Sequence, residues 1–207
     1  MAAKGSRRFP YTTVKGFLLL ICLIPLFLIG WDLRNGSLGP DPGQTITETL
    51  GITAFQLLLI TLAISPLRKL TGWAGWLRFR RMLGLFVFFY ASLHLLAFLQ
   101  FILGWFDLWD TFTKRPYIIA GALAFVLMIP LAFTSTKGMM KKLGRRWKPV
   151  HRLIYSSAVL VWIHFLWQAR SDITEMVLYG VVLAILLAAR VYWSGLSALV
   201  PLKKVGN

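Results

Sequence analysis

The chain alternates between long apolar runs and short polar segments. The runs carry almost no charged residues, and several approach or exceed the roughly 20 residues that an α-helix needs to cross a bilayer. The segments between them contain turn-forming residues, such as Asn35-Gly36 after the first run and Thr71-Gly72 after the second. The pattern predicts an all-α polytopic membrane bundle of six transmembrane helices. The expected spans are about 17–31, 49–67, 82–105, 117–133, 153–169 and 176–193.

Composition supports a polytopic membrane protein. Hydrophobic residues make up 57% of the 207 positions and charged residues only 14%, against about 25% in typical soluble domains. Basic residues precede the first run, as in a signal peptide, but no small-residue cleavage site follows Trp31. We therefore expect an uncleaved first span, kinked or broken near Pro25. The tails are too short for a soluble domain and no internal repeat is visible, so a single domain covering 1–207 is expected.

The distribution of basic residues predicts the orientation of the bundle. The net charge is +16, and nineteen of the 23 Lys and Arg residues fall on one side of the predicted spans. All seven Asp and Glu residues fall on the other side, together with four basic residues. Because short cytoplasmic loops carry the excess of Lys and Arg, both termini are expected in the cytoplasm. Membrane orientation thus explains the charge better than nucleic-acid binding does.

Two of the three histidines lie deep inside predicted spans. His94 is 13 residues into the third span and His164 is 13 residues past His151, where the fifth span begins. At about 1.5 Å per residue, both lie about 20 Å from the basic side, so they can face each other across the bundle. Opposed imidazoles are a natural axial pair for a b-type haem, which needs no covalent attachment motif. Histidines in a span can also serve only as hydrogen-bonding groups between helices, and that alternative stays open here.

A second site is indicated less clearly at the basic side. His151 is too far from the deep pair to share its iron, and the third span offers Arg80 and Arg81 at matching depth instead of a histidine. On an ideal helix Arg80 shares the face of His94, whereas Arg81 points elsewhere. Arg80 is therefore the better candidate, as an unusual ligand or as a partner for a haem propionate or a flavin phosphate. His151 and His164 would share a face only if the helix is irregular near Pro149.

Other chemistry is not indicated. The sequence contains no Ser-His-Asp set, no phosphate-binding glycine loop and no paired carboxylates within a span, which argues against a proton-coupled transporter. The lone Cys22 cannot form an internal disulfide or a metal site by itself, so a packing role is expected. No nicotinamide-binding domain is present, so an electron-transfer function would need a separate donor.

Two segments resemble a known family. RRMLGLFVFFYASLHLLAF, residues 80–98, and WKPVHRLIYSSAVLVWIHFLW, residues 147–167, resemble the ferric reductase-like transmembrane domain. Within it, the full length is similar to the MsrQ (YedZ) family, the haem-binding membrane subunits of periplasmic methionine sulfoxide reductase systems. His94, His151 and His164 fall on the family's histidines. The broader ferric reductase pattern has two histidines on each of two spans, and this chain departs from it at Arg80.

The resemblance implies a function that spacing alone does not give. It implies a multi-pass protein of the bacterial inner membrane that binds one or two b-type haems and also FMN. Electrons would come from a cytosolic flavin reductase or from membrane quinones. They would pass to a periplasmic molybdopterin-containing reductase, the MsrP type, which repairs methionine sulfoxide in oxidised envelope proteins. The chain would then be an electron-transfer subunit rather than the catalytic subunit.

Two alternatives stand beside this hypothesis. One is a ferric-chelate reductase that delivers electrons directly to external iron, which the missing nicotinamide domain disfavours. The other is a non-redox membrane scaffold or small transporter, in which the histidines only bridge helices.

Overall fold

The structure is a computed structural model that describes residues 10–104, 114–168 and 173–199. Its described part is helical and contains no strand, and six helices are long and apolar enough to cross a membrane. The predicted all-α fold of six spans is confirmed. The expected span ends at Trp105 and Ala169 lie outside the described residues. The spanning elements are α1 (Tyr11–Asn35), α2 (Pro42–Thr71), α3 (Leu77–Ala97) with the π-helix η2 (Phe98–Leu103), α5 (Pro116–Phe133), α8 (Leu153–Gln168) and α9 (Thr174–Leu199).

Short helices fill the connections at one end of the bundle. The 3-10 helix η1 (Ala74–Trp76) joins α2 to α3, and three short pieces join α5 to α8. These pieces are α6 (Lys137–Leu143), η3 (Gly144–Arg146) and α7 (Trp147–His151).

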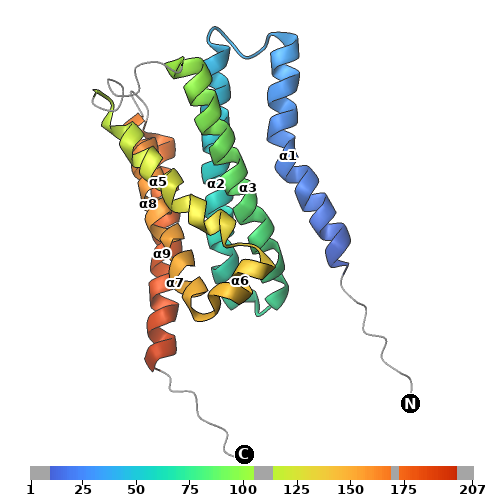
Figure 1. The fold of residues 1–207 in the computed structure, drawn as a ribbon, viewed down its shortest axis with the longest axis vertical. Coiled ribbons are helices and arrows are strands. Elements are labelled where there is room, and N and C mark those ends of the chain that lie inside the picture. Colours follow the sequence, from blue (N-terminus) through green and yellow to red (C-terminus); the bar gives the residue numbers. More distant parts are fainter. Residues whose placement is uncertain (1–9, 105–113, 169–172, 200–207) are drawn as a thin grey trace, which may run out of the picture.

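The ends of α2 follow from local chemistry. The Asp41 carboxylate accepts a hydrogen bond from the backbone N–H of Gln44, which caps the first turn, and Pro42 occupies the first helical position. The helix ends at Gly72, whose φ of 69° is the left-handed conformation that glycine adopts without strain. Because these signals lie outside the apolar run, α2 is longer than the expected span. The helix α1 is also continuous: it passes through Pro25 without a break and bends partway along its length (Figure 1).

Two helix pairs form the centre of the bundle. The α2–α3 pair and the α5–α8 pair make the most extensive contacts, and α9 packs against α2 and α8 (Figure 1). Buried apolar residues of these helices form the main core. At the α5–α8 contact the fully buried residues are small, and the Ser157 hydroxyl donates to the Ala124 carbonyl at 3.1 Å. Small residues let helix backbones approach closely in a membrane, so these two helices form a tight pair.

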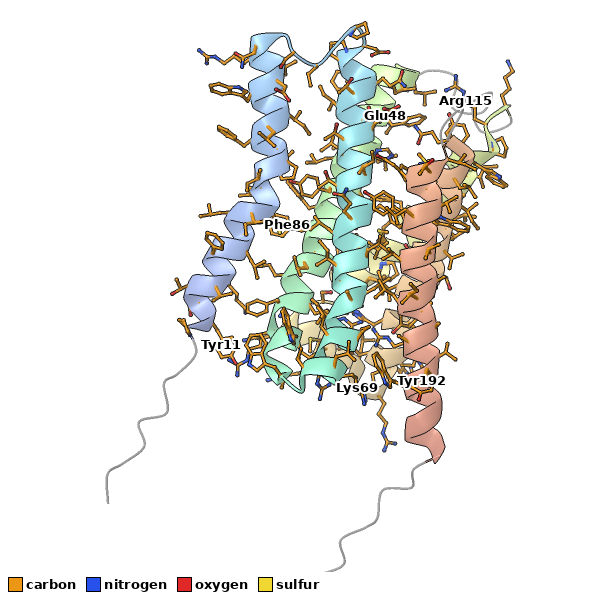
Figure 2. The ribbon with its side chains drawn as sticks, turned by 180° about the vertical axis from the view of Figure 1, so that it is seen from behind. Tyr11, Glu48, Lys69, Phe86, Arg115 and Tyr192 are labelled. Carbon is orange, nitrogen blue, oxygen red and sulfur yellow. The ribbon has the colours of Figure 1, made fainter. Side chains whose placement is uncertain are left out.

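The two ends of the bundle differ in charge. Tyr11, Lys69 and Tyr192 lie at one end, where most of the basic residues are found, and we call it the basic end (Figure 2). Glu48 and Arg115 lie at the opposite end (Figure 2). The four acidic residues of the described part belong to this second end, which we call the acidic end; they are Asp32, Asp41, Glu48 and Glu175.

The first helix is held to the rest of the bundle at few points. Most of its large apolar side chains are exposed, and only Cys22 is buried. Near the basic end the guanidinium of Arg78 lies 3.8 Å over the Tyr11 ring. Deeper in the bundle, the hydroxyl of Tyr90 donates to the backbone carbonyl of Cys22 at 2.6 Å, and Tyr90 is fully buried. This hydrogen bond is therefore a principal link between α1 and α3.

Replacing Tyr90 by Phe tests that link. The substitution removes one buried hydrogen bond at nearly constant volume, which should cost about 1 kcal/mol. We expect a lower apparent melting temperature in detergent, together with faster proteolysis of α1. The matched control is Tyr192→Phe, because Tyr192 is exposed. Equal melting temperatures for the two variants would show that the Tyr90 bond does not hold α1.

Candidate functional site

His94 and His164 face each other across the bundle. Their ring centroids lie 6.2 Å apart, and the ring planes are inclined at 79°. His94 projects from α3 and His164 from α8, so each of the two central helix pairs contributes one imidazole. We call His94 and His164 the histidine pair. The sequence predicts that they can face each other, because both lie at the same depth in their spans.

Backbone carbonyls fix the protonation of both rings. The Nδ1 atom of His94 lies 2.8 Å from the carbonyl oxygen of Thr47 on α2. The Nδ1 atom of His164 lies 2.7 Å from the carbonyl oxygen of Tyr117 on α5. Because a carbonyl only accepts hydrogen bonds, each Nδ1 must carry the proton. Each neutral ring is then left with a bare Nε2, the state in which an imidazole binds a metal.

A glycine beside each histidine makes these hydrogen bonds possible. In an α-helix the carbonyl of residue i points toward residue i+4, and the residues four positions after Thr47 and Tyr117 are Gly51 and Gly121. A Cβ atom on either glycine would lie 2.8 Å from Nδ1 of the facing histidine. Only glycine therefore leaves room for the ring to reach the carbonyl.

The surroundings of His94 and of His164 repeat the same spacing of residues. Each histidine lies 47 residues after the carbonyl that it contacts. The motif G-x-x-A-F-x-L begins at Gly51 in α2 and again at Gly121 in α5. The expectation that the chain has no internal repeat is therefore wrong: α2–α3 and α5–α8 are related hairpins. The repeat escapes inspection of the sequence because few identities survive outside this motif, and loops of different structure interrupt it.

The spacing of the histidine pair fits a haem iron. An iron held about 2 Å from each Nε2 places the two ring centroids about 6 Å apart, and the observed separation is 6.2 Å. In the described residues no group of three or more His, Cys, Asp or Glu side chains could hold a bare metal ion. Two opposed imidazoles are the axial donor set of a metal whose remaining ligands come from a macrocycle.

His151 is held in a different way. Its Nε2 lies 3.1 Å from the hydroxyl of Thr134, and that hydroxyl also lies 2.6 Å from the Pro130 carbonyl, to which it donates. Since the hydroxyl has only one proton, Nε2 of His151 is the donor in the first contact. The indole of Trp147 stacks on the ring at 4.0 Å between centroids and donates to the Thr134 carbonyl. Unlike the histidine pair, His151 thus has its Nε2 already engaged by the protein.

The chain is irregular just after His151, at the start of the segment that leads to His164. The helix α7 ends at His151 and α8 begins at Leu153. At this junction the backbone N–H of Arg152 donates to the Pro149 carbonyl, and the backbone N–H of Tyr155 donates to the Arg152 carbonyl. Each of these hydrogen bonds joins residues three positions apart, instead of the four of a regular α-helix. The irregularity near Pro149 that His151 and His164 would need in order to share a face is therefore present.

Arg80 and Arg81 have different surroundings. Arg80 is half-buried, and its Nη1 lies 3.4 Å from the Ser65 hydroxyl on α2. It also lies within electrostatic range of Tyr155 on α8 and of His151. Arg81 is exposed. The two candidates for the basic end, Arg80 and His151, thus lie within electrostatic range of each other, whereas Arg81 faces outward from the described protein as an exposed residue.

Comparison with known proteins identifies the class. Residues 50–163, which include His94 and end one residue before His164, match the family described as ferric reductase like transmembrane component, so the chain is a ferric reductase-like membrane protein. The protein-methionine-sulfoxide reductase heme-binding subunit MsrQ of Xanthomonas campestris pv. campestris (strain B100) is 50% identical over 184 residues. The proteins of the same name from Xanthomonas axonopodis pv. citri (strain 306) and Xanthomonas oryzae pv. oryzae (strain MAFF 311018) are 49% and 48% identical. Each comparison covers 85% of this chain and 84% of the relative.

The chain therefore belongs to the MsrQ family, and the resemblance seen in the sequence is confirmed. It is a multi-pass membrane protein of that family.

Sequence reasoning missed the groups that position the histidines. Gly51 and Gly121 were detectable only through the repeated G-x-x-A-F-x-L motif, and the carbonyls of Thr47 and Tyr117 carry no signal in a sequence. No sequence pattern indicates Arg190 either, whose guanidinium lies 5.3 Å from the centroid of the Tyr155 ring.

Proposed function

We propose that this protein is the haem-carrying electron-transfer subunit of a methionine sulfoxide reductase system, with His94 and His164 as the axial ligands of a b-type haem. The observation that carries the proposal is the pair of imidazoles with ring centroids 6.2 Å apart, each with Nδ1 hydrogen-bonded to a helix carbonyl. The relatives at 48–50% identity are named heme-binding subunits, which agrees with it.

The chain's own residues hold and tune this site. A haem bound there would take up and release one electron at a time. His94 and His164 present bare Nε2 atoms, and the carbonyls of Thr47 and Tyr117 fix the ring orientation and increase the basicity of the ligands. Each imidazole is packed against a glycine, which limits its rotation. Fixed ligands lower the reorganisation that accompanies a change of charge, which favours fast electron transfer.

We place FMN, the second cofactor implied by the resemblance, at the basic end beside Arg80 and His151. Arg80 can donate to a flavin phosphate, and the Arg–phosphate pair is a strong, often bidentate interaction. A second haem is less well supported in this position, because Nε2 of His151 is engaged by Thr134 and no histidine of the described residues opposes it. Arg81 is exposed and has no part in this arrangement.

The orientation of the bundle sets the direction of transfer. We infer that the basic end is cytoplasmic and that both termini lie there, in the inner membrane of a bacterium, since cytoplasmic loops carry the excess of Lys and Arg. His94 is bonded to Thr47, next to Glu48 at the acidic end (Figure 2). Electrons from a cytosolic flavin reductase or from quinones would thus enter near Arg80 and leave near the periplasm. The acceptor would be a periplasmic molybdopterin-containing reductase of methionine sulfoxide.

Single substitutions of the axial ligands give the first test. We expect His94→Ala and His164→Ala each to abolish the low-spin haem spectrum of the purified protein. Each substitution removes one of the two axial ligands, and the low-spin state needs both. His151→Ala should keep that spectrum, since His151 has another hydrogen-bonding role. The readout is the Soret and α-band absorbance, oxidised and dithionite-reduced. A haem that persists unchanged in both His94→Ala and His164→Ala would contradict the assignment.

The glycines give a second test that leaves both ligands in place. Gly51→Ala or Gly121→Ala puts a methyl group 2.8 Å from Nδ1 and displaces the ring from its carbonyl. We expect haem affinity to fall about 10- to 100-fold, the range for losing the outer partner of a metal-bound histidine. Gly30→Ala is the control, because a Cβ on Gly30 meets no atom within 4 Å. Equal haem retention in all three variants would show that the glycines do not position the ligands.

Deleting the gene for the periplasmic reductase in the host separates this function from a ferric-chelate reductase. Reduction of methionine sulfoxide in envelope proteins should collapse in that strain, and also in a strain that lacks this chain, because the two would work in series. Iron uptake should be unaffected in both strains. The reverse pattern, with intact methionine repair and impaired iron uptake when only this chain is missing, would favour the ferric-chelate function.

A further inference from the structure

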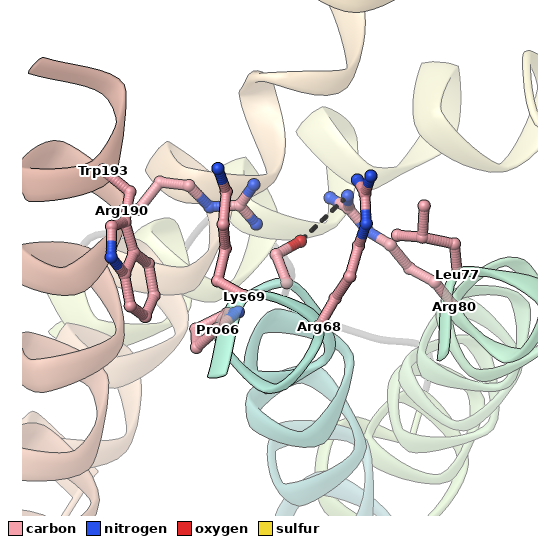
Figure 3. A pocket seen from close by; sticks show the side chains of 8 residues that line it. Pro66, Arg68, Lys69, Leu77, Arg80, Arg190 and Trp193 are labelled. Carbon is pink, nitrogen blue, oxygen red and sulfur yellow. Dashed lines mark hydrogen bonds between the residues drawn. The ribbon is translucent and has the colours of Figure 1, made fainter. Parts of the chain in front are cut away.

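A basic pocket lies at the basic end, apart from the histidine pair. It is a partly open cavity of about 370 Å³ between the end of α2, the start of α3 and α9 (Figure 3). Figure 3 shows Arg190 and Trp193 reaching in from α9, Arg68 and Lys69 from α2, and Arg80 from α3. The complete lining is Ser65, Pro66, Arg68, Lys69, Leu77, Arg80, Arg190 and Trp193.

The pocket collects positive charge without a compensating acid. Four of its eight lining residues are Arg or Lys, and none is Asp or Glu. The four acidic residues in the described part of the chain all belong to the acidic end. Their carboxylates therefore cannot neutralise the pocket, because the length of a transmembrane helix separates them from it.

One guanidinium in this pocket has an unused donor. Nη2 of Arg190 is buried and has no hydrogen-bond partner. The guanidinium of Arg190 lies over the Tyr155 ring. Among the four cations that line the pocket, only Arg80 has a hydrogen bond to Ser65, at 3.4 Å. An unpaired charged donor that is shielded from water is costly, and neighbouring cations repel each other as well. A bound anion relieves both costs at once.

The number and type of donors indicate which anion. Three guanidiniums and one ammonium supply many N–H donors around one small volume, and guanidinium groups pair with phosphate through two parallel hydrogen bonds. A phosphate monoester carries a charge of about −1.5 to −2 and three acceptor oxygens, which suits a site of this charge better than a single carboxylate does. The apolar side chains of Pro66, Leu77 and Trp193 leave a surface for the organic group that the phosphate carries.

We propose that this pocket is a phosphate-binding site, in which Arg190, Arg68 and Lys69 complete a cation cluster around Arg80. Two sources of phosphate fit a site at the cytoplasmic boundary of the bilayer. One is an anionic phospholipid headgroup, since basic pockets between transmembrane helices on that side bind such lipids. The other is the phosphate of FMN, in which case the site belongs to the flavin of the proposed function. The cation cluster is the shared chemistry, and the experiment separates the sources.

The test compares ligand retention in purified full-length protein. Wild type, Arg190→Gln, the double variant Arg68→Gln/Lys69→Gln and the control Arg145→Gln are purified in a neutral detergent. Arg145 is exposed at the same end and does not line the pocket. FMN is quantified by fluorescence after denaturation, and co-purified phospholipid by native mass spectrometry. Each protein is then titrated with FMN and, separately, with short-chain phosphatidylglycerol. The haem spectrum of every sample is recorded as an independent check of the fold.

We expect wild type and Arg145→Gln to hold one phosphate-bearing ligand per chain. Arg190→Gln should bind that ligand at least about tenfold more weakly, since removing one partner of a charge-assisted hydrogen bond costs a factor of this order. The exposed double variant should weaken it less, and added salt should weaken binding in all of the proteins. Loss of FMN alone identifies the flavin as the source, and loss of the lipid alone identifies the headgroup.

Two results would overturn the proposal. One is equal affinity of wild type and Arg190→Gln for both probes, and the other is no binding of either probe to wild type. A misfolded Arg190→Gln is recognised by its lost haem, and the double variant then decides. A wild type that lacks haem but binds phosphate in an Arg190-dependent way would refute the proposed haem site and leave the phosphate site standing.

Discussion

The contact between each imidazole and a helix carbonyl is the interaction on which the candidate site depends. In a bilayer the backbone groups of a spanning helix are already paired within it, so they are rarely accessible to side chains of neighbouring helices. Gly51 and Gly121 remove the side chain that would cover the carbonyl one turn earlier, and the histidine ring occupies the vacated space. The proton then stays on Nδ1, and both rings are pre-organised as ligands before any iron arrives.

This constraint appears twice because the bundle contains two copies of one hairpin. Thr47, Gly51 and His94 in α2–α3 correspond to Tyr117, Gly121 and His164 in α5–α8. At the acidic half of the bundle the copies are alike and supply equivalent groups. At the basic end they diverge: one contributes Arg80, bonded to Ser65, and the other contributes His151, bonded to Thr134. The two hairpins thus supply equivalent groups at one end of the bundle and different groups at the other, which agrees with the proposal of a haem at one end and FMN at the other.

The sequence predicts the parts of this structure that depend on one-dimensional patterns. Apolar runs and caps give the six helices, and counting 13 residues from the basic side gives the shared depth of His94 and His164. Helical phase also separates Arg80 from Arg81 correctly, because α3 is regular over that interval. The carbonyl contacts could not be predicted, since they depend on how two helices pack. Arg190 was missed for a similar reason: it belongs to the last span, and only folding brings it beside residues of α2 and α3.

In the proposed function, electron transfer depends on the histidine pair and on the cations at the basic end. The electron paramagnetic resonance spectrum of the oxidised wild-type protein tests most directly whether His94 and His164 are the axial ligands of a haem. We expect a low-spin ferric haem with two imidazole ligands, and the 79° between the ring planes predicts the strongly anisotropic signal of nearly perpendicular ligands. A high-spin signal from a haem with one histidine, or a purified protein without haem, would contradict it.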